Sequence, residues 1–212
     1  MDSRFPSVLI AIPYHDRKSY CLPQVMEAVK NLTYPNKEVL MRWDFNPFGQ
    51  KDNVKKQREF ARLVAVDRGF DYLYFLGCDT IPPSNIIELL LEAEGFPVIG
   101  GVYFGRNKII DHVVAWKEGY SPEQFSEMAK GNLDEYRYLY PDGMGMDSVL
   151  IHSEIFRKFS WMSYVVNDDD YPFYDWLNSE NIPIVLDTFA QCKHYFDEDG
   201  KVFYSLKGVK HG

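Results

Sequence analysis

The sequence has 212 residues, of which 46% are hydrophobic and 16% aromatic, and its formal net charge is −8. This length and composition allow one large domain with a sizeable core. The negative charge disfavours a nucleic-acid partner, because nucleic-acid phosphates are bound by basic surfaces. The three cysteines are widely separated and form no CxxC pair. They therefore argue against a zinc ribbon or a disulfide scaffold and favour a reducing, cytoplasmic setting.

No apolar run approaches the length that a transmembrane helix needs. The apolar segment at 8–13 is too short for the core of a signal peptide. A peripheral membrane contact stays open, because exposed aromatic residues cannot be located from sequence. We expect residues 1–212 to form a single domain.

Strand-like and helix-like segments alternate through the first half of the chain. Apolar, strand-like runs lie at 8–12, 38–43, 72–76 and 97–103. Segments with helical spacing lie between them, at 22–32, 53–68 and 86–94. Strands that alternate with helices imply βαβ units, so we predict an α/β fold around a mainly parallel sheet flanked by helices.

The second half of the chain is less regular. Short strands are expected at 113–116, 137–140, 148–152, 184–186 and 189–193. Helices are expected between 153 and 159 and at 171–180. Mixed elements after a doubly wound half suggest a nucleotide-binding half at 1–105 joined to an acceptor-binding half at 106–212.

One acid stands at the end of an uncharged, strand-like run. The run 72–76 leads into Gly77-Cys78-Asp79, and a double proline follows at 82–83. Ligands of open α/β sheets bind beyond the carboxyl ends of strands. A carboxylate there can hold a cation against a phosphate-bearing ligand. The alternative is a turn or helix N-cap role for Asp79, and this segment alone does not separate the two.

Asp16 and Asp44 follow the first two predicted strands in the same way. Like charges at one sheet edge repel each other unless a ligand or cation uses them. Asp44 can accept hydrogen bonds from a base or ribose, and Tyr14 can stack on a base. The basic run 55–58 begins a helix and can face a diphosphate, although a solvated helix face is the commoner fate of such charges.

Two candidates lie near the end of the chain. The three acids at 168–170 suit a solvated loop, a helix N-terminus or a general base. His194 follows the predicted strand at 189–193. A lone histidine is usually structural, but with Asp79 it can complete a site for Mn²⁺ or Mg²⁺.

The order of these motifs resembles that of the GT-A-fold nucleotide-sugar glycosyltransferases, especially the large inverting family. Residues 8–17 look like the first strand and nucleotide loop of that family, and 57–79 like the helix and strand that lead to its metal-binding DxD motif. The segment 143–156 resembles the acceptor loop. Asp169-Asp170-x-x-Phe173 looks like the ED-x-x-F segment, and 182–187 followed by His194 resembles the closing strand and metal ligand.

The resemblance implies a role for each matching residue. The nucleotide of a UDP- or GDP-sugar is expected at Pro13, Tyr14, Asp44, Arg58, Cys78 and Asp79. Mn²⁺ or Mg²⁺ is expected at Asp79 and His194. The acceptor, whether glycan, lipid or protein, is expected at Gly145, Met146 and Asp147. Asp170 is the implied catalytic base, with Asp169 as the alternative, and inversion of the sugar is the implied outcome.

The chain departs from the family pattern at two places. Gly77 stands where the first acid of the DxD motif is expected, and Asp169 replaces a glutamate. Three other functions stay open: a nucleotide-sugar-binding protein with weak or no catalysis, a nucleotidyltransferase, and an interaction module. The nucleotidyltransferase is disfavoured because the loop at 13–18 has no glycine.

Overall fold

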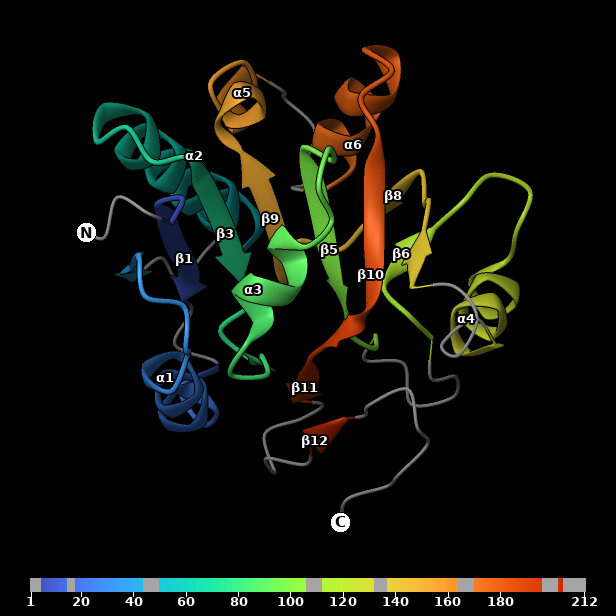
Figure 1. Cartoon of the computed structure of the whole chain (residues 1–212), viewed down its shortest axis with the longest axis horizontal. Coiled ribbons are helices and arrows are strands. Elements are labelled where there is room, and N and C mark those ends of the chain that lie inside the picture. Colours follow the sequence, from blue (N-terminus) through green and yellow to red (C-terminus); the bar gives the residue numbers. More distant parts are fainter. Residues whose placement is uncertain are drawn as a thin grey trace.

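The protein is built around a seven-stranded mixed sheet with the strand order β2-β1-β3-β9-β5-β10-β7 (Figure 1). This computed structural model describes residues 5–14, 18–43, 50–105, 112–131, 137–163, 170–195 and 202–203. Five strands run in one direction: β1 (Val8–Tyr14), β2 (Lys37–Trp43), β3 (Tyr72–Leu76), β5 (Val98–Val102) and β10 (Ile184–Gln191). β9 (Ser148–His152) and β7 (Tyr138–Leu139) run against them. The predicted α/β fold with a mainly parallel sheet is confirmed.

Both faces of the sheet are buried under helices. Leu9 and Ala11 of β1 belong to one hydrophobic cluster, whereas Val8, Ile10 and Ile12 belong to the other, as expected for a strand whose side chains alternate between faces. The first cluster includes residues of α2 (Gln50–Asp67), α4 (Pro122–Gly131), α5 (Ser153–Phe156) and α6 (Tyr171–Ser179). The second includes residues of α1 (Leu22–Lys30) and α3 (Ile86–Leu91). None of the described helices is long and apolar enough to cross a membrane.

Local sequence signals start and stop several helices. A proline lies in the first turn of α1 and of α6, where its missing N–H is not needed. α2 ends at Asp67, and Gly69 then adopts a left-handed φ of 69°. Glycine takes that conformation without steric cost, so Gly69 suits the end of a helix, which lies one residue before the predicted limit at 68. α3 begins at Ile86, as predicted, and ends at Leu91 rather than at Glu94.

Two small sheets lie beside the main one. β11 (Lys193–Tyr195) pairs with β4 (Thr80–Ile81) and with β12 (Val202–Phe203), while β6 (Ala115–Trp116) pairs with β8 (Gly143–Met144). In Figure 1, β10 leads into β11 at the edge where β1, β3 and β5 also end. The β4–β11 pairing places His194 opposite Thr80, which brings it next to the Asp79 turn.

The predicted strands at 72–76 and 148–152 are confirmed with the same limits. The prediction of two separate strands at 184–186 and 189–193 is wrong. A single strand, β10, spans Ile184–Gln191 with a register shift after Asp187, and His194 lies inside β11 rather than after a strand ending at Lys193. Asp187 lies within the strand and is fully buried, and Arg137 compensates its charge by pairing with its carboxylate at 2.7 Å.

Candidate active site

The turn after β3 fixes the backbone of Asp79. The Gly77 N–H donates to the Asp147 carbonyl at 2.9 Å, and the Thr80 N–H donates to the Gly77 carbonyl at 3.1 Å. The Tyr195 N–H donates to the Asp79 carbonyl at 2.8 Å. The turn is therefore held by β11 and by the segment that follows β8. Asp79 is a turn residue, as one prediction had it, and its fully buried carboxylate also faces other charged groups.

Three potential ligand side chains meet at this turn. One ligand atom each from Asp79, Asp147 and His194 lies within 4.8 Å of the other two. His194 Nε2 is 3.3 Å from Asp79 Oδ2 and 4.0 Å from Asp147 Oδ2. His194 Nδ1 is 2.7 Å from the Phe104 carbonyl. A carbonyl only accepts hydrogen bonds, so Nδ1 carries a proton there and Nε2 is the nitrogen directed at the carboxylates.

Gly77 makes the approach of Asp147 possible. A Cβ at position 77 would lie 2.6 Å from Asp147 Cγ and 2.8 Å from Asp147 Oδ1. Real side chains do not approach so closely, so Asp147 would have to move for any residue other than glycine. Gly77 stands where the first acid of the DxD motif was expected, and the Asp147 carboxylate packs against it. Sequence analysis missed this role of Asp147, because no local spacing links residues 77 and 147.

A positive side chain already faces the cluster. Lys18 Nζ lies 2.9 Å from Asp79 Oδ2. A buried carboxylate requires such compensation, because removing an isolated charge from water is costly. Two carboxylates and one imidazole are also ligands that suit Mn²⁺, and the carboxylates suit Mg²⁺. The donor set, with the Asp147 carboxylate packed against Gly77, therefore fits a divalent cation.

Asp170 forms a second charged pair at the start of α6. Its Oδ1 is 2.6 Å from Arg58 Nη1 of α2, and the Arg58 side chain is only 4% exposed. Asp170 occupies the N-cap position, but its side chain makes no capping hydrogen bond. The ion pair fixes the orientation of the Asp170 carboxylate, and a general base must be positioned within reach of the proton that it takes. Arg58 had been expected at the diphosphate, and the structure places it on Asp170.

Tyr103 links the two acidic groups. The Asp147 N–H donates to the Tyr103 hydroxyl oxygen at 3.2 Å. Burial raises the pKa of Tyr103 well above its ordinary value of 10.0, and the negative charges of Asp147 and Asp170 raise this pKa further. The charges of both carboxylates therefore reach the same buried tyrosine. Asp170 thus lies close enough to the Asp79–Asp147–His194 cluster for its charge to matter there.

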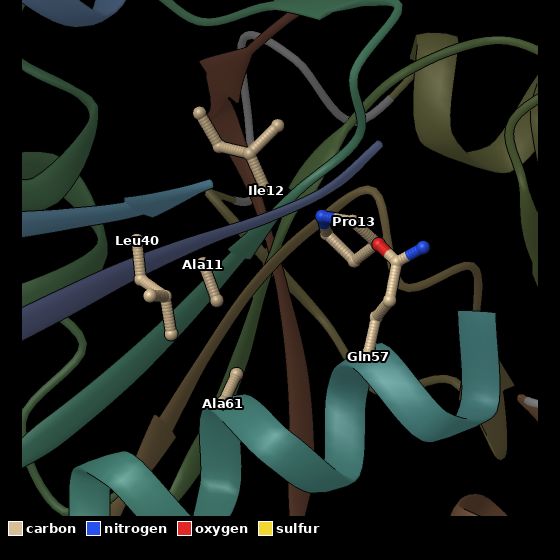
Figure 2. A pocket seen from close by; sticks show the side chains of 6 residues that line it. All are labelled: Ala11, Ile12, Pro13, Leu40, Gln57 and Ala61. Atoms are coloured by element: carbon tan, nitrogen blue, oxygen red, sulfur yellow. The ribbon is translucent and has the colours of Figure 1, made fainter. Parts of the chain in front are cut away.

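The end of β1 is closed by a side-chain clamp from α2. Gln57 accepts a hydrogen bond from the Tyr14 N–H at 2.8 Å and donates one to the Tyr14 carbonyl at 3.1 Å. The Tyr14 ring is 8% exposed and belongs to the hydrophobic core. Pro13 and Gln57 line a small cavity beneath β1 (Figure 2). Its volume of about 10 Å³ is near the lower limit for one water molecule, so it is not a nucleotide site.

Of the remaining predicted site residues, some are described by the structure and others are not. Cys78 and Met146 are buried, and the thioether of Met146 accepts a hydrogen bond from the Tyr174 hydroxyl at 3.3 Å. The Gly145 N–H donates to the Val114 carbonyl at 2.8 Å. The nucleotide and acceptor roles of these residues stay predictions. Asp16, Asp44 and Asp169 lie outside the described residues.

Comparisons with known proteins support the fold. No protein-family model matches the chain, and no curated protein matches it. The crystal structure of A197 from STIV is similar over 97% of this chain and 98% of that chain, with a TM-score of 0.61 and 21% identity. This likeness shows a common fold. The structure of a glycosyltransferase involved in the glycosylation of the major capsid of PBCV-1 matches 82% of this chain and 76% of that chain, with a TM-score of 0.47 and 9% identity. At that TM-score, nothing is inferred from this second match.

Proposed function

We propose that this protein is a glycosyltransferase that moves a sugar from a nucleoside-diphosphate sugar to an acceptor hydroxyl, assisted by a divalent cation. One observation carries the proposal: Asp79, Asp147 and His194 converge at the end of β3. That edge is where ligands of α/β sheets bind. The order of motifs that resembles GT-A glycosyltransferases supports the same function.

Asp79, Asp147 and His194 would hold Mn²⁺ or Mg²⁺. When bound, the cation supplies Lewis-acid stabilisation of the charge that grows on the leaving diphosphate. The resemblance puts Pro13, Tyr14 and Asp44 beside the nucleotide. A UDP or GDP donor and a cytoplasmic location are part of the proposal.

Asp170 is the proposed general base. Arg58 holds its carboxylate at 2.6 Å and so orients it. In one displacement, Asp170 takes the proton of the acceptor hydroxyl as its oxygen attacks the anomeric carbon, and the diphosphate leaves from the opposite face. The sugar is therefore inverted. The backbone at Gly145 and Met146 is the proposed docking place for the acceptor.

The proposed function is tested with a panel of UDP- and GDP-sugars in the presence of Mn²⁺, with release of nucleoside diphosphate as the readout. A glycosyltransferase should release diphosphate slowly from its own donor even when water is the acceptor. Calorimetry with the same donors separates the competing function. Tight binding without any release on prolonged incubation would identify a nucleotide-sugar-binding protein. Release of pyrophosphate from a nucleoside triphosphate would identify a nucleotidyltransferase instead.

A further inference from the structure

We propose that Lys18 is a built-in counter-ion of Asp79 and must be displaced from it when a divalent cation binds. The contact behind this proposal is the 2.9 Å ion pair between Lys18 Nζ and Asp79 Oδ2. The same oxygen lies 3.3 Å from His194 Nε2. Lys18 therefore occupies Asp79 Oδ2, the oxygen that a metal ion held between Asp79 and His194 would need.

The backbone of Lys18 is fixed next to the Asp79 turn. Its carbonyl accepts hydrogen bonds from the Cys21 N–H at 3.3 Å and from the Cys21 thiol at 3.0 Å. The thiol is also 3.2 Å from the Cys78 carbonyl, one residue before Asp79. Cys21 is fully buried and immediately precedes α1. It thus holds the start of α1 against the turn after β3, which keeps Lys18 within reach of Asp79.

The side chain of Lys18 has a route away from this position. It is 28% exposed, whereas the side chain of Asp79 is 0% exposed. Lysine carries its charge on a flexible four-carbon stem, so the ammonium can swing toward solvent while the backbone stays in place.

The charges of the cluster favour the exchange. Asp79 and Asp147 carry two negative charges, and one ammonium leaves part of that charge uncompensated. A divalent cation compensates both carboxylates. An ammonium and a metal ion on the same oxygen would lie within a few ångströms and repel each other strongly in a poorly solvated site. The two states are therefore mutually exclusive, and the lysine lowers the apparent affinity for the metal.

The test measures binding of Mn²⁺ alone to the full chain by calorimetry, without any donor. Lys18→Met should bind Mn²⁺ about tenfold more tightly than the wild type, which corresponds to about 1.4 kcal/mol. Lys18→Gln, which keeps a polar tip, should act in the same direction, and Lys18→Arg should keep the weaker affinity. Lys158→Met removes an exposed lysine elsewhere and should leave the affinity unchanged.

A second readout is the melting temperature in EDTA and in Mn²⁺. Lys18→Met should melt below the wild type in EDTA, because Asp79 loses its counter-ion, and Mn²⁺ should raise its melting temperature more than that of the wild type. Equal or weaker Mn²⁺ affinity in both Lys18→Met and Lys18→Gln, or no Mn²⁺ binding by any variant, would overturn the proposal. Although the metal role rests on the proposed function, tighter Mn²⁺ binding without sugar transfer would sustain this inference and refute the transferase.

Discussion

The carboxylate of Asp170 is the group whose replacement should affect catalysis most selectively. Asp170→Asn keeps the shape of the side chain but removes its basicity, and we expect the rate of sugar transfer to fall by about 10²- to 10⁴-fold. Binding of the nucleotide should stay close to that of the wild type. Asp175→Asn, an exposed acid on the same helix, is the matched control and should be neutral. Full transfer activity in Asp170→Asn would remove Asp170 from the mechanism.

Gly77 and Asp147 should behave as a coupled pair. Gly77→Ala places a methyl group 2.6 Å from Asp147 Cγ, so the carboxylate must leave its position. We expect Mn²⁺ affinity to fall by about 10- to 100-fold, the range seen when groups that orient metal ligands are lost. Asp147→Ala should also weaken Mn²⁺ binding.

A double-mutant cycle checks the coupling by calorimetry. Gly77→Ala should have little further effect on Mn²⁺ affinity once Asp147 is alanine, because no carboxylate remains to be displaced. Additive losses in the double variant would show that Gly77 acts on the site in some other way. The reciprocal exchange, Gly77→Asp with Asp147→Gly, should recover part of the affinity.

At this scale the sequence predicts candidate ligands that lie at strand ends or follow them. Asp79 and His194 are predicted because each stands beside a strand-like run, and the structure brings their side chains together. The part played by Asp147 depends on two loops meeting in space and on the absence of a side chain at residue 77. Lys18 has no distinguishing spacing either. Its partner is identified only when the loop before α1 is seen against the turn after β3.

The clamp between α2 and the end of β1 is a testable feature of the elements. Gln57→Ala would remove the two buried hydrogen bonds that the Gln57 amide makes with the Tyr14 backbone. Such a loss costs about 1–3 kcal/mol of the free energy of unfolding. Urea denaturation measures it, and Gln24→Ala on the exposed face of α1 is the control. Equal stability of the two variants would mean that water replaces the amide at no cost.

Among the elements, the buried parallel strands are the most predictable. A strand covered on both faces reads as a continuous apolar run, which is why β3 is recognisable. β10 is harder, because Asp187 interrupts its apolar pattern. Its charge is tolerated because Arg137, which lies far away in the sequence, donates to both carboxylate oxygens. The Phe189 N–H also donates to Oδ1. β4 and β8 are two residues each, carry little local pattern and were missed. α4 was also missed, although Ser121 and Gln124 form a capping box at its start.

The whole molecule should lose stability at alkaline pH. Burial raises the pKa of the Cys192 thiol from 9.0 to about 12. Burial is also the largest cause that raises the pKa of Tyr34 from 10.0 to about 12. Both groups stay neutral in the folded state at pH values where they ionise in the unfolded chain. Their contribution is complete below about pH 9 and is lost as the pH rises toward 12, for Cys192 by up to about 1.4 kcal/mol per pH unit.

Urea unfolding at a series of pH values measures this loss. Cys192→Ser removes the titrating thiol but keeps a hydrogen-bonding group beside Ser148, whose hydroxyl lies 3.4 Å from the Cys192 sulfur. The decline of stability above about pH 9 should be shallower in this variant. An unchanged slope would show that Cys192 does not contribute to the alkaline instability.

The central claim for the molecule is sugar transfer that depends on a divalent cation held by Asp79, Asp147 and His194. Release of diphosphate tests this claim most directly. With the donor that the panel selects, the wild type should release nucleoside diphosphate in Mn²⁺ and lose this activity in EDTA. Asp79→Ala should be inactive under both conditions while retaining a cooperative unfolding transition. Release by Asp79→Ala at the wild-type rate, or the absence of release from every donor by folded wild-type protein, would contradict the claim.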